Sequence, residues 1–239
     1  MSDIIAVGGA GFLTDPANLA LEKYIVDQAR KDSPRVLMIA TARGDDARYV
    51  ATFHEAFGCL GAVTSHLPFF ERTPDLRSLL LSQDVIYVGG GNTKSMLGVW
   101  REWGLTGILE EAHNQGIVLG GQSAGAICWF QEGVTDSWAD RLRPLGCIGL
   151  LQGSCCPHYD GDRERRPAYH ALIERGEIAP GYAIDDGAAG HFRDRRLERV
   201  VSKRPGSGAY FVTVEHDAVD ERALEVTLLP ASADLLEPL

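Results

Sequence analysis

The sequence predicts an α/β protein with a flavodoxin-like, doubly wound and mostly parallel sheet that carries helices on both faces. In the first two thirds of the chain, short and almost continuously apolar segments alternate with longer amphipathic ones, as in parallel sheets buried on both sides. Glycine clusters follow three of the apolar segments, at Gly8-Gly9, Gly89-Gly90-Gly91 and Gly120-Gly121. In such folds, ligands bind at the carboxyl ends of the strands. The last third contains short extended segments, which predict a C-terminal antiparallel hairpin added to the sheet.

Each element follows from its apolar spacing. We expect strands at residues 4–9, 35–40, 62–69, 85–88 and 117–119, and helices at 18–31, 45–57, 75–81, 94–103 and 106–115. An apolar stretch of helical length follows residue 123. Near the C-terminus, residues 187–192, 197–201, 209–214 and 224–229 read as strands, and 205–208 (PGSG) as a turn between two of them.

Composition indicates one globular enzyme-sized domain over residues 1–239. Hydrophobic residues make up 45% of the 239 and charged residues 23%, an ordinary globular balance. The net charge of −10 argues against a general nucleic-acid binder. No apolar run approaches the roughly 18 residues of a membrane span, and Met1-Ser2-Asp3 lacks the basic region of a signal peptide, so we expect a cytoplasmic protein.

The cysteines do not suggest a metal or disulfide framework. The five are scattered, and the chain contains no CxxC pair and no H-E-x-x-H. We therefore expect reduced, mostly buried thiols, no metal site and no cofactor.

The most informative segment is Gly121-Gln122-Ser123-Ala124-Gly125, a G-x-S-x-G motif between a strand and a helical segment. This is the context of a nucleophile elbow, in which small neighbours make room for a strained serine. The sequence therefore predicts Ser123 as a nucleophile. The competing interpretation is a glycine-rich turn without catalysis.

A serine nucleophile needs a base and an orienting acid. His158 is the best base, because it follows an apolar segment and lies 35 residues after Ser123. For the acid we favour Asp136, the first acid in the loop after the nucleophile segment. Asp140, Asp160 and the pair Asp185-Asp186 stay open as alternatives.

An oxyanion hole needs two backbone donors. We expect one from Ala124 and one from the glycine-rich segment at residues 89–93 (GGGNT). A phosphate-binding loop is the rival interpretation, but the segment lacks both the Walker lysine and the G-x-G-x-x-G spacing.

At these residues the chain resembles the dipeptidase E family of serine peptidases, which includes the cyanophycinases. The resemblance is carried by GGGNT at 89–93, GQSAGA at 121–126, Pro157-His158 and the Asp-Asp-Gly at 185–187. It implies a fold like that of class I glutamine amidotransferases, and cleavage after aspartate or release of β-linked aspartyl residues, without a metal. By position it implies Ser123 as nucleophile, His158 as base, and Gly91 and Ala124 as oxyanion donors. It also places Asp136 as the acid, although two positions closer to the serine than in the best-known members.

The family further implies an arginine soon after the histidine that holds the substrate aspartate. Arg163 is the expected match, with Arg165 and Arg166 close by, and we expect Asn92 as a second substrate-binding residue. The predicted function is a serine-type peptidase that hydrolyses short peptides, in particular dipeptides with an N-terminal aspartate, through an acyl-enzyme. A homodimer is compatible with this prediction. The alternatives are an α/β esterase and a non-catalytic, amidotransferase-like binding domain.

Overall fold

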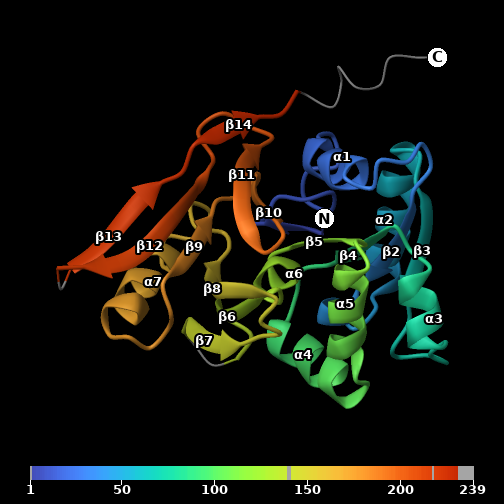
Figure 1. Ribbon diagram of the computed structural model, residues 1–239, viewed down its shortest axis with the longest axis horizontal. Helices are drawn as coiled ribbons and strands as arrows, with labels where there is room; N and C mark the ends of the chain where they lie inside the picture. The colour runs from blue at the N-terminus through green and yellow to red at the C-terminus, as the bar shows by residue number, and fades with distance from the viewer. Residues whose placement is uncertain (1, 139–140, 217, 231–239) are drawn as a thin grey trace.

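The computed structural model of the protein describes residues 2–138, 141–216 and 218–230, and these residues form two β-sheets (Figure 1). The larger sheet has eight strands in the order β14-β11-β10-β1-β5-β4-β2-β3. The smaller has six, in the order β13-β12-β9-β8-β6-β7. The predicted α/β class is therefore confirmed, but the second sheet was not predicted.

Five neighbouring parallel strands form one side of the larger sheet, from β1 to the edge strand β3. They are β1 (Asp3–Val7), β2 (Arg35–Ile39), β3 (Val63–Leu67), β4 (Val85–Val88) and β5 (Val118–Gln122). The run β3-β2-β4-β5 matches the first four neighbours of the flavodoxin-like order. The fifth place, however, is taken by the N-terminal strand β1.

Helices cover both faces of this sheet, as the alternation of its strands requires. Ile5 and Val7 pack in one core with α1 (Ala20–Asp27) and α2 (Ala47–Cys59). Ile4 and Ala6 point to the opposite face. That face is covered by α3 (Leu76–Leu81), α4 (Thr93–Glu102), α5 (Leu105–Asn114) and the short α6 (Ala124–Ile127).

The C-terminal hairpin is confirmed. Strands β10 (Ala188–Arg193) and β11 (Arg196–Ser202) pair antiparallel, and β10 lies antiparallel to β1. β14 (Val226–Leu228) then adds parallel to β11. The turn at 205–208 does not join two strands of this hairpin, since β12 (Ala209–Glu215) pairs with strands of the other sheet.

The smaller sheet begins where a helix was expected. α6 spans one turn, and the chain then extends into β6 (Phe130–Thr135). The other strands are β7 (Arg143–Gly146), β8 (Leu151–Cys156), β9 (Gly181–Ile184) and β13 (Ala218–Ala223). α7 (Arg165–Glu174) packs against β12 and β13. Because β6, β8 and β9 are mutually parallel, their carboxyl ends lie at one edge.

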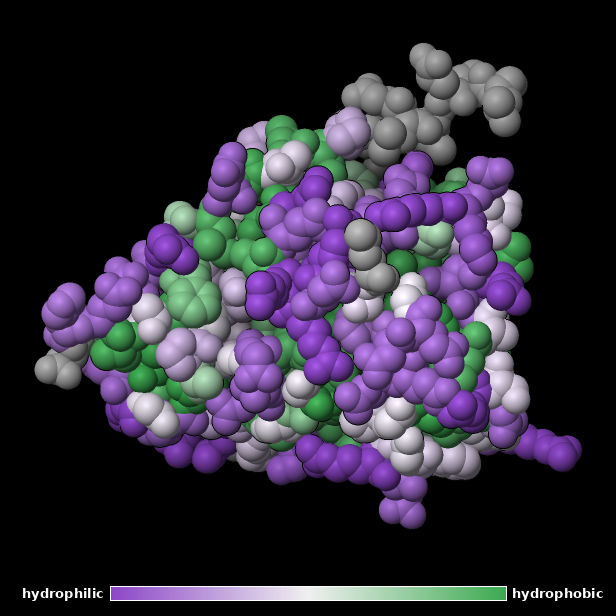
Figure 2. Space-filling model, viewed as in Figure 1, coloured by the Kyte–Doolittle hydropathy of each residue, from purple (hydrophilic) through white to green (hydrophobic). Residues whose placement is uncertain are grey.

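The surface is mainly hydrophilic on the face shown in Figure 2, with apolar residues gathered beside β14. Val226 and Leu228 of that strand are exposed. Among the described helices, none has both the length and the apolar character to cross a membrane.

Candidate active site

Ser123 occupies a strained turn between β5 and α6. Its φ of 55° and ψ of −112° lie outside the conformations that non-glycine residues ordinarily adopt. The turn is possible only with small neighbours, because a Cβ at Gly125 would lie 2.1 Å from the carbonyl oxygen of Val88. The elbow geometry expected from G-x-S-x-G is therefore present, although the helix behind it is a single turn.

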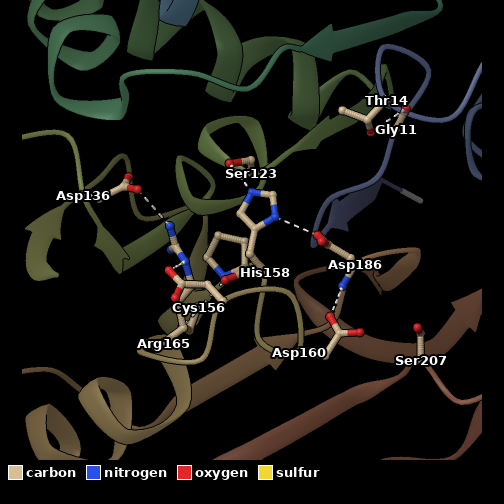
Figure 3. Close-up of polar contacts among 12 residues, drawn as sticks. Gly11, Thr14, Ser123, Asp136, Cys156, His158, Asp160, Arg165, Asp186 and Ser207 are labelled. Atoms are coloured by element: carbon tan, nitrogen blue, oxygen red, sulfur yellow. Dashed lines mark hydrogen bonds and ion pairs between the residues drawn. The ribbon is translucent and has the colours of Figure 1, made fainter.

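His158 reaches Ser123 from the second sheet, two residues beyond the end of β8 (Figure 3). Its Nε2 lies 2.9 Å from Oγ of Ser123, and its Nδ1 lies 2.6 Å from Oδ1 of Asp186. An ionised carboxylate only accepts hydrogen bonds, so Nδ1 of His158 carries the proton and donates it to Asp186. In that tautomer, Nε2 is free to accept from the hydroxyl of Ser123.

Asp186 lies two residues beyond the end of β9, just as His158 lies two beyond the parallel neighbour β8. The hydrogen bond from His158 holds the pKa of Asp186 below its ordinary value. The backbone N–H of Asp186 donates to Oδ1 of Asp160 at 2.7 Å. A Cβ at Gly9 would come within 2.0 Å of Oδ1 of Asp186 and 2.4 Å of Nδ1 of His158. The hydrogen-bonded side chains of His158 and Asp186 thus occupy space that is open only because residue 9 is glycine.

The structure corrects the position expected for Asp136. Its side chain follows β6, is 72% exposed, and lies 3.3 Å from Nη2 of Arg165 rather than against His158 (Figure 3). Of the other candidates, Asp160 supports the backbone of Asp186 and accepts from Arg204. Asp140 lies outside the described residues.

Backbone donors converge beside Ser123. Gly90 and Asn92 donate their N–H groups to the Tyr49 hydroxyl and the Ala42 carbonyl, at 3.2 and 2.7 Å. The N–H of Gly91 between them has no acceptor among the described residues. Ala124 begins α6, so its N–H has no intrahelical acceptor either. These are the two groups that the sequence predicted as oxyanion donors.

A cavity of about 370 Å³ opens over Ser123, and its arginine from α7 is Arg165, not Arg163. The Arg165 side chain is only 6% exposed and pairs with Asp136 and Asp162, while its Nε and Nη1 make no hydrogen bond. Arg163 is exposed and does not line the cavity. The buried positions of α7 begin with Arg165 and continue with Tyr169 and Leu172. That helical spacing is the signal that could have selected Arg165 over its neighbours.

Asn92, expected at the substrate, instead caps a helix. Its Oδ1 accepts from the N–H of Ser95, and its Nδ2 donates to the carbonyl of Ser137, both at 2.9 Å. It does not line the cavity. Its amide oxygen therefore caps α4, and its amide nitrogen joins the start of α4 to the loop after β6.

One described group has the composition of a metal site, away from the cavity. Asp3, His191 and Glu198 bring ligand atoms within 4.8 Å of one another. Arg193 already donates to both carboxylates, with Nε to Asp3 at 2.9 Å and Nη1 to Glu198 at 2.7 Å. The guanidinium thus supplies the positive charge that a cation would bring.

The sequence and the fold are similar to those of known peptidases. Residues 4–200 match the model of peptidase family S51. An uncharacterized peptidase, YgaJ, from Bacillus subtilis is 50% identical over 230 residues, covering 96% of this chain and all of the relative. Peptidase E from Haemophilus influenzae is 26% identical over 80% of this chain and 88% of the relative.

Solved structures agree at the level of the fold. A peptidase from an acI-B1 Actinobacterium superposes with a TM-score of 0.70 at 17% identity, covering 97% of each chain. A putative peptidase E from Listeria monocytogenes gives 0.60 at 19% identity, covering 94% of this chain and 100% of the other. The resemblance inferred from GGGNT, GQSAGA and Pro157-His158 is confirmed: the chain belongs to peptidase family S51.

Proposed function

We propose that this family S51 peptidase is a serine hydrolase that cleaves dipeptides with an N-terminal aspartate. The observation that carries the proposal is the hydrogen-bonded series from Ser123 through His158 to Asp186, with both distances below 3 Å. A nucleophile, a base and an orienting carboxylate in this order form a catalytic triad. Asp186 thus takes the role that the sequence analysis gave to Asp136.

The chemistry follows from the geometry. Oγ of Ser123 attacks the scissile carbonyl while Nε2 of His158 takes its proton, and Asp186 stabilises the resulting imidazolium. The N–H groups of Gly91 and Ala124 stabilise the oxyanion. His158 then protonates the leaving amine as the acyl-enzyme forms, and a water molecule activated by the same histidine releases the product.

The position of Arg165 favours a substrate whose first residue is acidic. Its buried guanidinium lies beside the cavity that contains Ser123, and its Nη1 makes neither a hydrogen bond nor an ion pair with the described residues. A buried donor without an acceptor is costly, and a carboxylate would satisfy Nη1. The aspartyl side chain of a substrate would supply that carboxylate. Asp136 and Asp162 hold the guanidinium from its other sides.

The test combines a covalent probe with a dipeptide panel. A fluorophosphonate should label wild-type protein and not Ser123→Ala, whereas a non-catalytic binding domain would not be labelled at all. Aspartyl dipeptides should be hydrolysed faster than the matched asparaginyl dipeptides and faster than simple esters, which an esterase would prefer.

A matched arginine pair tests the specificity. Arg165→Gln should lower kcat/KM for aspartyl dipeptides by roughly 10²-fold, the loss expected for a charged hydrogen-bonded pair, while labelling of Ser123 persists. Arg163→Gln, an equal change two residues away on the surface, should behave as wild type. Equal losses on aspartyl and asparaginyl substrates in Arg165→Gln would contradict the assignment.

A further inference from the structure

A second arginine lines the cavity from the larger sheet. Arg43 ends the 3-10 helix η1 (Thr41–Arg43), which follows β2, and it borders the same cavity as Gly91 and Ser123. In contrast to Arg165, its guanidinium makes no ion pair or hydrogen bond with any described residue. The cavity thus contains one cation that neighbouring carboxylates hold and one that is free.

The position of Arg43 is set by the glycine-rich segment at residues 89–93, which we call the oxyanion loop. The Ala42 carbonyl accepts from the N–H of Asn92 at 2.7 Å, and a Cβ at Gly91 would lie 3.0 Å from Cγ of Arg43. The guanidinium stacks over the buried ring of Tyr49, 5.0 Å from its centroid. Stacking covers one face of the guanidinium and leaves its N–H edge available to a ligand.

We propose that Arg43 binds the C-terminal carboxylate of the dipeptide and so restricts the enzyme to substrates with one residue after the scissile bond. The inference rests on the proposed function, which puts the scissile oxygen at the N–H of Gly91. Standard bond lengths place the carboxylate of the next residue within about 4 Å of the scissile carbon. Because Cγ of Arg43 packs against Gly91, the guanidinium at the end of the same side chain can meet a carboxylate at that distance from the scissile carbon.

In this arrangement, each of the two arginines binds one carboxylate of an aspartyl dipeptide. Arg165 takes the side chain of the first residue, and Arg43 takes the terminus of the second. A longer peptide replaces the terminal carboxylate with a neutral amide, which has one oxygen and no charge and so cannot form the bidentate pair with the guanidinium. Rejection of longer substrates would therefore arise from a lost charged contact as well as from space.

The experiment compares aspartyl-leucine with aspartyl-leucine amide. Wild type should prefer the free acid by roughly 10²-fold in kcat/KM, the value of a charged hydrogen-bonded pair. Arg43→Gln should reduce that preference to a few-fold by losing activity on the acid, with the amide almost unchanged. Arg48→Gln, an exposed arginine outside the cavity, should keep the wild-type preference.

The result separates failure of this inference from failure of the proposed function. An unchanged acid-to-amide ratio in Arg43→Gln, with aspartyl dipeptides still hydrolysed, would overturn the role of Arg43 alone. If Arg43→Gln instead erased the preference for aspartyl over asparaginyl dipeptides, the two arginines would have exchanged roles and the inference would be wrong. If wild type hydrolysed no aspartyl dipeptide, the proposed function would fail, and this inference with it.

Discussion

The two sheets contribute different kinds of groups to the site. The larger sheet supplies Ser123 and the proposed oxyanion donors, the N–H groups of Ala124 and Gly91, from the turns after β5 and β4. The smaller sheet supplies His158, Asp186 and Arg165, from segments that follow β8 and β9 and from α7. The first group depends mainly on backbone conformation, whereas the second depends on charged and titratable side chains. The site is thus assembled at the meeting of a backbone scaffold and a set of polar side chains.

The sharpest test removes one partner from each sheet. Ser123→Ala and His158→Ala should each lower kcat/KM for an aspartyl dipeptide on the order of 10³-fold or more, and the double variant should lose little further, because a catalytic unit is non-additive. Circular dichroism and thermal midpoints would check that both fold. Full activity in Ser123→Ala, or losses that multiply in the double variant, would contradict a shared mechanism across the sheets.

The contribution of the larger sheet was predictable because it is local. GQSAGA and GGGNT each place their functional atoms within a few residues of one strand end, where steric rules for small residues apply. The smaller sheet depends on pairing between distant segments. The sequence offered Asp136 and Asp186 as alternatives, and only the parallel alignment of β8 with β9 brings Asp186 to His158.

The fold shows the same division. The five parallel strands and the β10–β11 hairpin follow from apolar periodicity. The second sheet was missed because the apolar run at residues 124–130 has a length that suits either one helix or a turn followed by a strand. Periodicity in so short a run does not separate the two.

Exchanging the acids tests the smaller sheet. Asp186→Asn should lower kcat on the order of 10²-fold or more, because the amide can no longer favour the protonated imidazole. Asp136→Asn should leave kcat nearly unchanged and alter KM only, since its partner is Arg165. Steady-state kinetics on one dipeptide would separate the two effects. A larger kcat loss in Asp136→Asn would restore the original assignment of the acid.

A smaller effect is expected beneath the oxyanion loop in the larger sheet. The Tyr49 hydroxyl accepts from the N–H of Gly90 at 3.2 Å and from Nε2 of Gln122 at 3.4 Å. It therefore links the loop to the residue before Ser123. Tyr49→Phe keeps the ring and should lower kcat by about 10-fold with KM unchanged, as one positioning hydrogen bond is lost.

A second tyrosine provides the control. Tyr24→Phe likewise removes a hydrogen-bonded hydroxyl, but this hydroxyl is bonded to His191 and does not line the cavity. It should leave kcat at the wild-type value. Equal kcat in both variants would show that the Tyr49 hydroxyl does not position the loop.

The smallest effect concerns stability where the sheets meet. Asp185 follows β9, is buried, and accepts from the N–H of Gly208 at 2.9 Å. A Cβ at Gly8, after β1, would lie 2.3 Å from its carbonyl oxygen, so the two sheets touch here. Burial raises the pKa of Asp185 from 3.8 to about 6.

Because the folded pKa exceeds the unfolded one, the folded state binds the extra proton between these values, and stability falls as pH rises through that window. The loss of stability caused by ionising Asp185 is complete above about pH 6 and absent below about pH 4. Asp185→Asn removes the charge but keeps an acceptor for Gly208. A shift of about two pKa units corresponds to about 3 kcal/mol. The weaker hydrogen bond from Gly208 to the neutral amide offsets part of this. We therefore expect the free energy of unfolding of Asp185→Asn to exceed that of wild type by about 1 kcal/mol at pH 8. Urea unfolding at pH 8 and pH 4 would measure it. The gain should vanish at pH 4, and a gain of equal size at both pH values would show that the ionisation of Asp185 does not weaken the contact between the sheets.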